Sequence, residues 1–504
     1  MAASELAPDW LAYPGDVNAL RPAEWAAGVD RARDGELTVQ GLPVTALAKE
    51  FGTPLFVLDE DDFRARARGF KEAFDEAFAP LCGGVDVYYA GKAFLSIEVA
   101  RWVTEEGLRL DTCSGGELAV ARRAGVPPRN LGLHGNNKSV AEIEAALELG
   151  IGRIVVDSLD ELGRVAAVAA RLGRTAPVML RLTPGVHAHT HEFIATAHED
   201  QKFGLSLAAG AADDAAAGEG APAGGAGGAG TGADGSAPPS WGPFDASPAA
   251  AAVARALADP ALELLGVHCH IGSQIFEAEG FNLAAERLIG FLAAVRAHHG
   301  VELGELDLGG GYGIAYTAED APRPPAELAA SMADVVRAAT ARHGLAVPRI
   351  SIEPGRAIAG PSTFTLYEAG VRKTVTVDTD SGTARRRYVS VDGGMSDNAR
   401  PVLYDADYTA VLASRVTDAE PIISRVVGKH CESGDIVVRN VYLPEDVAAG
   451  DLLAVPATGA YCWALSSNYN YLGRPAVVAV RGGAARTIIR RETEDDLLAR
   501  DMGA

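Results

Sequence analysis

The sequence predicts an α/β fold in which a (β/α)8 TIM barrel is followed by an all-β barrel or sandwich domain. Two observations lead to this prediction. Short apolar runs alternate with helical stretches up to about residue 360, and eight strand-then-helix units are what such a barrel requires. Beyond Gly360, short strand-like runs follow one another with few helices between them. An open doubly wound sheet is the alternative for the first part, but it normally has fewer strands in series.

The expected barrel strands and helices can be placed on the chain from their periodicity. The strands are Val85–Ala90, Leu108–Asp111, Leu131–His134, Arg153–Asp157, Val178–Leu182, Leu264–His268, Glu305–Leu308 and Arg349–Glu353. Helical stretches between them include Ser114–Ala124, Ser139–Leu149, Ser158–Leu172 and Phe281–His298. Ser139 has Glu142 three residues on, and Ser158 has Glu161, which is the spacing of a capping box at the start of a helix.

We expect residues 1–54 to join the β domain, residues 55–360 to form the barrel and residues 361–504 to form the C-terminal β domain. An insertion at about 208–248 consists of Gly, Ala, Asp, Ser and Pro with almost no large apolar side chain. Such a segment cannot bury enough surface to offset its ordering entropy, so we expect a disordered loop. The expected strands of the second domain are Thr363–Ala369, Val371–Val377, Arg387–Val391, Pro421–Gly428, Asp435–Asn440, Leu452–Val455, Ala476–Val480 and Ala485–Arg490.

Composition and charge narrow the function classes. The net charge of −22 argues against a nucleic-acid partner, because nothing offsets phosphate repulsion. The five cysteines are scattered and form no CxxC pair, which favours a reducing cytoplasm and argues against disulfides or a metal site built on cysteine. The first residues lack a basic segment followed by an apolar one, and no run reaches the roughly 20 apolar residues of a membrane span, so we expect neither a signal peptide nor a membrane partner.

Polar side chains follow nearly every expected barrel strand at its C-terminal end, where this fold places its chemistry. They are Lys92, Asp111, His134, Asp157, Arg181, His268 with His270, and Glu353 with Arg356. Each has an ordinary explanation when taken singly: Lys92 as a solvated lysine, His134 or His268 as a core histidine, Asp157 as a helix cap. Their recurrence at so many strand ends is hard to obtain from packing alone and indicates a functional site.

Two of these strand ends carry more information. Gly309, Gly310 and Gly311 follow the seventh strand, and such a loop lets the backbone approach an anion at the usual phosphate site of this barrel. Its glycine spacing is not that of a dinucleotide fingerprint. Glu353-Pro-Gly-Arg356 follows the eighth strand. A lysine amine for an aldehyde, a glycine loop for a phosphate, a carboxylate for a ring nitrogen and an imidazole to stack on a flat ring are the parts of a pyridoxal phosphate site.

Three stretches of the second domain also attract attention. Arg400-Pro-Val-Leu-Tyr404 supplies a second arginine and a tyrosine, and Cys431-Glu-Ser-Gly-Asp435 places a thiol beside a carboxylate in a turn. A buried structural thiol is the commonest fate of a free cysteine, but the neighbours of Cys431 are polar. Gly459-Ala-Tyr461 is the third stretch, and from spacing alone a packed strand end explains it equally well.

With these residues in hand, the chain resembles the fold-type III pyridoxal-phosphate decarboxylases from about Thr53 to Gly473. The matching motifs are YYAGKAF at 88–94, DTCSGGEL at 111–118, HGNNKS at 134–139, THEFI with KFG at 190–204, HIGSQ at 270–274, GGGYGI at 309–314, EPGR at 353–356, CESGD at 431–435 and GAY at 459–461. The Gly/Ala-rich insertion departs from the family pattern.

The resemblance implies a role for each matched residue. Lys92 would hold the cofactor, His270 would stack on its ring and Glu353 would hold the ring nitrogen. Residues expected to bind the cofactor phosphate and its surroundings are Ser273, Gly311, Pro354, Gly355, Arg356 and Tyr461; those expected to bind substrate are Arg356, Arg400, Tyr404, Glu432 and Tyr461. Cys431 would be the general acid, entering with Glu432 from the other subunit of a homodimer.

The implied activity is decarboxylation of an amino acid, and three alternatives stay open. Arg400 and Glu432 favour meso-2,6-diaminopimelate as substrate and L-lysine as product, because a second arginine wants a second carboxylate. Decarboxylases of ornithine or arginine share the fold, and alanine racemase is a further enzyme of this kind that lacks the CESGD pattern. An inactive cofactor-binding homologue is disfavoured by the retention of both Lys92 and Cys431.

Overall fold

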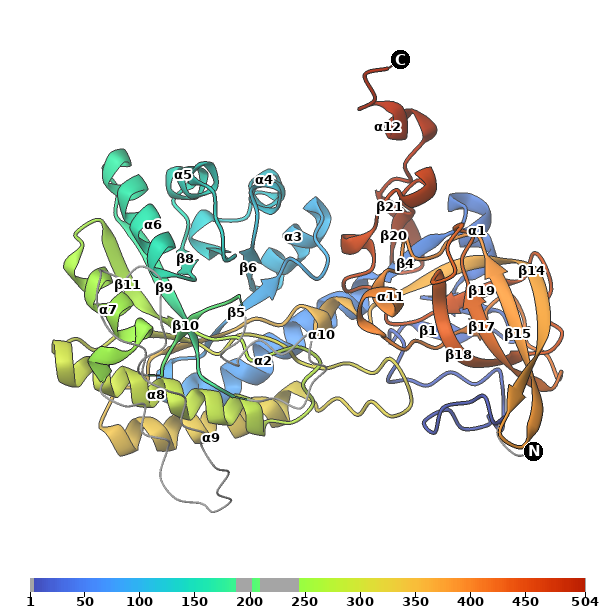
Figure 1. The fold of residues 1–504 in the computed structure, drawn as a ribbon, viewed down its shortest axis with the longest axis horizontal. Helices are drawn as coiled ribbons and strands as arrows, with labels where there is room; N and C mark the ends of the chain where they lie inside the picture. Colours follow the sequence, from blue (N-terminus) through green and yellow to red (C-terminus); the bar gives the residue numbers. More distant parts are fainter. Residues whose placement is uncertain (1–3, 187–201, 209–243, 504) are drawn as a thin grey trace.

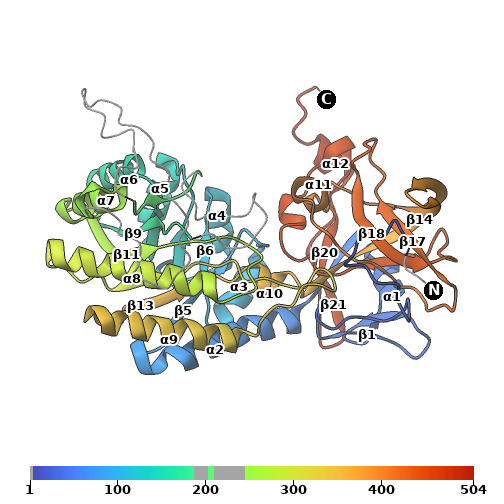
Figure 2. The same ribbon diagram turned by 60° about the horizontal axis from the view of Figure 1, so that its bottom comes forward.

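The computed structural model describes residues 4–186, 202–208 and 244–503, which form a barrel and a separate sheet domain. Figures 1 and 2 show the helix-covered barrel at one end of the molecule and the sheet domain at the other. Both chain termini lie on the side of the sheet domain. No helix in the described ranges combines the length and the apolar character that crossing a bilayer demands.

The barrel is a closed ring of eight parallel strands, as predicted. Its order is β9-β11-β12-β13-β5-β6-β7-β8, and β8 pairs with β9 to close it. The strands are β5 (Val85–Ala90), β6 (Arg109–Thr112), β7 (Leu131–Leu133), β8 (Arg153–Val156), β9 (Ala176–Thr183), β11 (Leu262–His268), β12 (Glu305–Asp307) and β13 (Arg349–Ile352), while β10 (Leu205–Ser206) pairs only with the end of β9. The predicted TIM barrel is confirmed.

Helices cover the outside of the barrel (Figure 1). They are α2 (Glu60–Cys82), α3 (Ile97–Glu105), α4 (Gly115–Ala124), α5 (Val140–Leu149), α6 (Leu159–Leu172), α7 (Pro248–Ala258), α8 (Glu279–His299) and α9 (Pro325–His343), with short pieces at α10 (Arg356–Ala359) and Pro128–Asn130. Ser139 forms the expected capping box with Glu142. Ser158 caps α6, but the Glu161 carboxylate instead accepts hydrogen bonds from Lys138 and from the Asp157 backbone.

The sheet domain contains the predicted run of strands. They are β14 (Thr363–Thr379), β15 (Gly382–Val391), β16 (Val411–Leu412), β17 (Pro421–Val427), β18 (Ile436–Pro444), β19 (Leu452–Val455), β20 (Ala476–Arg481) and β21 (Ala484–Ile489), with short helical pieces at α11 (Arg400–Tyr404), α12 (Glu494–Leu498), Trp463–Leu465 and Tyr469–Tyr471. The two strands expected at 363–377 are one strand, β14, with a register irregularity between Ala369 and Arg372.

The N-terminal segment packs on this sheet domain. Its elements are β1 (Val29–Arg31), β2 (Leu37–Val39), β3 (Leu42–Pro43) and α1 (Val44–Phe51). Leu37 and Val39 are fully buried in one apolar cluster with Phe364 and Leu366 of β14. The Leu37 N–H also donates to the Ala413 carbonyl.

One strand lies on the other side of the boundary that we predicted. The barrel was expected to begin at residue 55, but β4 (Leu55–Asp59) pairs antiparallel with β14 and parallel with β20. The chain therefore contributes a central strand to the sheet domain before it enters the barrel through α2. The apolar run of β4 is the same in either location, and only the pairing partners distinguish them.

The predicted disordered insertion falls mostly on residues 209–243, which lie outside the described residues, as do residues 187–201 with the THEFI motif. Its last residues belong to the fold. Phe244–Ala246 forms a short 3-10 turn, and the Phe244 ring lies 4.5 Å from the His298 ring and 5.4 Å from Phe291 of α8. Ser247 then caps α7 through the Ala250 N–H.

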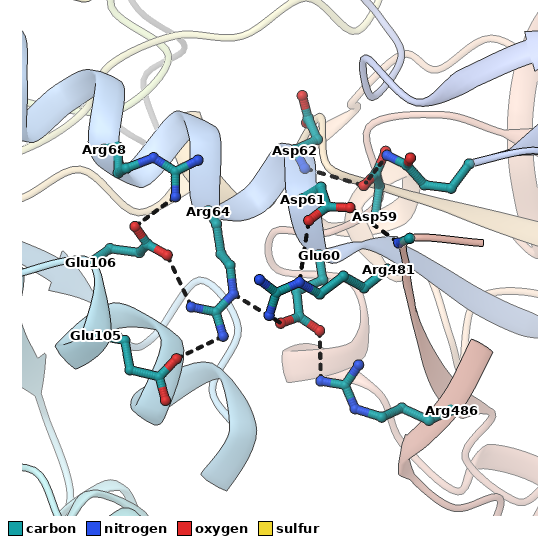
Figure 3. A network of polar contacts seen from close by, with 12 residues as sticks. Asp59, Glu60, Asp61, Asp62, Arg64, Arg68, Glu105, Glu106, Arg481 and Arg486 are labelled. Carbon is teal, nitrogen blue, oxygen red and sulfur yellow. Dashed lines mark hydrogen bonds and ion pairs between the residues drawn. The ribbon is translucent and has the colours of Figure 1, made fainter. Parts of the chain in front are cut away.

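A buried carboxylate joins the two domains where the chain passes from β4 into α2 (Figure 3). Glu60 is 1% exposed, and its Oε1 accepts from Arg64 Nε at 2.8 Å and from Arg481 Nη1 at 3.1 Å. Its Oε2 lies 2.6 Å from Arg486 Nη2. Arg481 ends β20 and Arg486 lies in β21, so one side chain of the barrel's first helix holds two strands of the sheet domain.

Candidate active site

Lys92 follows β5 at the C-terminal end of the barrel and lines a cavity of about 270 Å³. Hydrogen bonds hold the turn that carries it: the Tyr89 hydroxyl donates to the Phe94 carbonyl at 2.7 Å, and the Gly91 N–H donates to the Asp111 carbonyl at 3.0 Å. The cavity is lined by Ala90, Gly91, Lys92, Asp111, Thr112, Cys113, Glu117, His134, Gly135, Asn136, Arg181, Phe203, His270 and Glu353. The predicted cofactor residues Lys92, His270 and Glu353 thus face one space.

Glu353 lies among imidazoles at the bottom of this cavity. Its Oε1 is 3.0 Å from His268 Nε2 and 3.4 Å from His134 Nε2, and His134 Nε2 is also 3.1 Å from Asp111 Oδ1. Burial raises the pKa of Asp111 to about 7 and lowers the pKa of His134 well below its ordinary value. Burial raises the pKa of Glu353, whereas the nearby His268 and His134 lower it. The two imidazoles together outweigh burial, so the net shift is downward and favours the carboxylate.

His270 is another imidazole of the site whose pKa is lowered. Burial, followed by the charge of Lys92, lowers the pKa of His270 well below its ordinary value. A neutral imidazole therefore faces the cavity near pH 7. Its Nδ1 accepts from the Gly310 N–H at 3.3 Å, which orients the ring against the glycine-rich loop. A neutral, oriented ring is suited to stacking on a flat cofactor.

His134, His268 and Glu353 could in principle coordinate a metal ion, because one ligand atom of each lies within 4.8 Å of the others. Arg153 Nη2 is 3.7 Å from the same Glu353 oxygen, however, and a permanent cation there disfavours a second cation. The carboxylate is better suited to accept a charge-assisted hydrogen bond from a protonated ring nitrogen. Glu353 Oε1 is buried and, although it lies 3.0 Å from His268 Nε2, it accepts no hydrogen bond of good geometry from the described residues, which fits that use.

The glycine-rich loop after β12 and the loop after β11 form a backbone cradle. Gly311 has φ of +111°, and a Cβ there would lie 2.3 Å from the Gly272 carbonyl oxygen, so only glycine permits this approach. Ser273 follows Gly272 in the chain, and its hydroxyl accepts a hydrogen bond from Arg356 Nη2 at 2.8 Å. The Nε of Arg356 is buried without a hydrogen-bond partner in the described structure. A phosphate group fits this combination of close backbone, hydroxyl and guanidinium.

The Glu353-Pro-Gly-Arg356 turn packs directly on the lysine turn. The Pro354 carbonyl accepts from the Ala90 N–H at 3.2 Å, and a Cβ on Gly355 would lie 2.9 Å from the Ala90 Cβ. Tyr461 of the sheet domain donates its N–H to the Ala93 carbonyl at 2.9 Å, and its ring lies 4.7 Å from the Arg356 guanidinium carbon. The GAY stretch is therefore part of the site's wall, and the two domains meet here.

A second arginine lies one ring away. The guanidinium carbon of Arg400 is 4.6 Å from the Tyr316 ring centre, and that of Arg356 is 5.7 Å from the same ring. Arg400 also donates from Nη1 to the Tyr408 hydroxyl at 2.6 Å and is 7% exposed. The structure thus places both arginines against the same tyrosine ring.

Three predicted residues lie at the surface, whereas Arg356 and Arg400, which do not line the cavity either, are buried. Tyr404, Cys431 and Glu432 are all exposed, and none of them lines the cavity around Lys92. The backbone N–H of Cys431 donates to Asn470 Oδ1 at 3.1 Å, on the outside of the sheet domain. The ordinary explanation of Cys431 as a buried thiol is therefore wrong.

Sequence reasoning left several residues of the site without a role. Asp111, His134, His268 and Arg181 do stand at strand ends, and that position was the signal that could have assigned them. Arg153, Tyr316 and Tyr408 carried no such signal. Arg153 opens a strand, and the two tyrosines become neighbours of the arginines only through the fold.

The comparison with known families decides the kind of protein. The pattern described as "Pyridoxal-dependent decarboxylase, pyridoxal binding domain" matches residues 60–220 and 235–360, and the "Pyridoxal-dependent decarboxylase, C-terminal sheet domain" matches residues 364–459. The chain belongs to the pyridoxal-dependent decarboxylases. Pyridoxal phosphate is accordingly its cofactor, and the glycine cradle, Arg356 and Glu353 fit that group.

Three relatives of this decarboxylase are informative. Diaminopimelate decarboxylase of Mycobacterium tuberculosis is 52% identical over 487 residues, covering 96% of this chain and 98% of the relative. The enzyme of that name from Corynebacterium efficiens is 49% identical over 486 residues, covering 96% and 95%. The crystal structure of diaminopimelate decarboxylase from M. jannaschii in complex with L-lysine aligns with a TM-score of 0.79 at 28% identity, covering 95% of this chain and 98% of that one.

Proposed function

We propose that this decarboxylase removes one carboxylate from meso-2,6-diaminopimelate to give L-lysine and CO2, the last step of lysine biosynthesis. The observation that carries the proposal is the pair of arginines that contact the same tyrosine, Tyr316. Arg356 belongs to the anion cradle, and Arg400 adds a buried cation beside it. A substrate with a second carboxylate satisfies that cation, whereas the free amine of ornithine would be repelled by it. The relatives named above support the same substrate.

Each residue has a part that follows from its chemistry. Lys92 would hold the cofactor through its amine, His270 would stack on the ring, and Glu353 would keep the ring nitrogen protonated. When bound, pyridoxal phosphate supplies an electron-withdrawing ring for the electron pair left by the departing carboxylate. Ser273, Gly311, Gly355, Arg356 and Tyr461 would bind the phosphate and orient the substrate.

The proton that replaces CO2 at Cα would come from the Cys431 thiol. A general acid must lie within hydrogen-bond reach of the atom that it protonates, and Cys431 does not line the cavity of its own chain. We therefore propose a homodimer in which Cys431, Glu432 and Tyr404 complete the site of the partner subunit. Glu432 would recognise the distal amino group, and Tyr404 would bind substrate carboxylate.

Exposed apolar side chains beside Cys431 support the dimer. Leu403 is 54% exposed and Tyr471 is 66% exposed, and Val402 and Tyr469 are also exposed. Asn470, which binds the Cys431 backbone, lies between Tyr469 and Tyr471. Apolar patches of this kind mark interaction surfaces. We further propose a cytoplasmic enzyme, since all five cysteines are unpaired, as a reducing compartment requires.

The substrate is tested with a panel of meso-diaminopimelate, L-ornithine, L-arginine and L-lysine and identification of the products. Turnover of meso-diaminopimelate to lysine is expected. Preferred turnover of ornithine or arginine would refute the substrate assignment, and no turnover of any of them by protein with bound cofactor would favour an inactive homologue.

The shared site is tested by mixing two inactive variants, Lys92→Ala and Cys431→Ala. If the site is completed by the partner subunit, each mixed dimer has one intact site. Free reassortment would then restore roughly a quarter of the wild-type activity. No recovery after verified subunit exchange would show that both residues act within one chain.

A further inference from the structure

The inside of the barrel contains a buried arginine to which the proposed mechanism gives no part. Arg153 opens β8 and is 1% exposed. Its Nη2 lies 2.5 Å from Asp307 Oδ2, its Nη1 donates to Ser351 Oγ at 2.9 Å, and its guanidinium carbon is 3.6 Å from the Tyr88 ring centre. A cation removed from water in this way requires close partners, and these contacts provide them.

The same guanidinium also reaches the carboxylates of the active site. Arg153 Nη2 is 3.6 Å from Asp111 Oδ1 and 3.7 Å from Glu353 Oε1. Apolar side chains of similar volume often replace a buried ion pair with no loss of stability, so stability alone does not explain an arginine here. Its position between three carboxylates, two of which line the Lys92 cavity, points to a role in the site.

Asp307 connects Arg153 to the glycine-rich loop. Asp307 Oδ2 also accepts from the Ser351 hydroxyl at 2.8 Å, while Oδ1 accepts from the Gly309 N–H at 2.7 Å. The next residue, Gly310, donates its N–H to His270 Nδ1. The orientation of Asp307, set by Arg153 and Ser351, therefore fixes where the loop begins.

Glu353 needs a charge partner whose own charge does not depend on pH. Its imidazole neighbours, His268 at 3.0 Å and His134 at 3.4 Å, carry a charge only when they are protonated, and burial drives His134 toward the neutral form. An arginine remains charged in proteins at all ordinary pH values. Arg153 thus favours the ionised Glu353 carboxylate at the short range at which a buried charge acts strongly.

We propose that Arg153 is a positioning residue for the cofactor: it keeps Glu353 charged and aimed at the ring nitrogen and, through Asp307, fixes the start of the glycine-rich loop. It touches neither substrate nor cofactor. The inference rests on the proposed role of Glu353 as the partner of the ring nitrogen.

The test measures binding to the apoprotein rather than turnover. Arg153→Met is titrated with pyridoxal phosphate and with its 1-deaza analogue, in which carbon replaces the ring nitrogen, by equilibrium dialysis. We expect the affinity for pyridoxal phosphate to fall roughly 10–100-fold, the scale for an outer partner of a bound group. The affinity for the analogue should fall much less, because Glu353 has no ring N–H to hold there.

Arg109→Met is the matched control. Arg109 also lies over Tyr88, at 5.5 Å, but it pairs with Asp86 at 2.8 Å and is 34% exposed. Its loss should change neither affinity. Arg153→Lys keeps the charge but not the paired donors, so it should show a smaller loss that again falls mainly on the affinity for pyridoxal phosphate. It carries the test if Arg153→Met does not fold.

Equal losses for the two ligands in the Arg153 variants would overturn the inference, as would the same losses in Arg109→Met. Glu353→Gln separates this failure from a failure of the proposed function. If Glu353→Gln loses more affinity for pyridoxal phosphate than for the analogue and the Arg153 variants do not, only the role of Arg153 is refuted. If Glu353→Gln also weakens both ligands equally, the assignment of Glu353 itself fails.

Discussion

Replacing Glu60 by glutamine should weaken the joint between the two domains by about 2–4 kcal/mol. The change keeps the shape of the side chain but removes a charge that contacts Arg64, Arg481 and Arg486 (Figure 3). Removing one partner of a buried ion pair typically costs about 3–5 kcal/mol. The cost is lower here, because Arg64 keeps Glu105 at 2.8 Å and Glu106 at 2.9 Å. Arg481 and Arg486 are 54% and 43% exposed, so each adds at most about 1 kcal/mol.

Equilibrium unfolding in urea measures this free energy, and Asp61→Asn is the matched control. Asp61 is the next residue of the same helix turn, so any effect of the helix dipole is shared. It is 44% exposed, and its ion pair is a single 3.4 Å contact with Arg481. Asp61→Asn should cost less than about 1 kcal/mol. Equal losses in the two variants would refute the argument that burial makes Glu60 the stronger link.

Three further predictions follow from the site and its surroundings. Cys431→Ala should bind substrate and lose kcat by roughly 10²–10⁴-fold, the usual contribution of a general acid, while Cys82→Ala should not; an unchanged kcat would reject Cys431 as the proton donor. Arg400→Met should raise KM for meso-diaminopimelate by roughly 10–100-fold through one lost charge-assisted contact, and Arg385→Met, whose side chain is 60% exposed and pairs with Glu445, should leave KM unchanged. Burial raises the pKa of Glu24 from 4.5 to about 7, so its ionisation disfavours the folded state increasingly between these pH values. Glu24→Gln should therefore leave stability unchanged at pH 4 and increase it by up to about 3 kcal/mol at pH 8, and the same difference at both pH values would contradict this.

The order of strands and the residues at their ends were predictable from the sequence. A strand period of two and a helix period of 3.6 are local properties, so the eight alternating units predict a barrel before any contact is known. The barrel then brings all C-terminal strand ends to one rim, and for this reason Lys92, His270 and Glu353 could be assigned to one site.

Contacts between distant segments were decided only by the tertiary structure. The apolar run of β4 fits either sheet, and its pairing with β14 and β20 depends on which strand edges are free in the folded chain. Arg153 opens a strand of ordinary composition, and only barrel closure surrounds it with Asp307, Ser351 and Glu353. Cys431 likewise lies in a motif that indicates chemistry, yet the fold leaves it on the outer surface. The periodicity of side chains depends only on residues that are close in the sequence, whereas the partners of a buried charge are determined by three-dimensional packing.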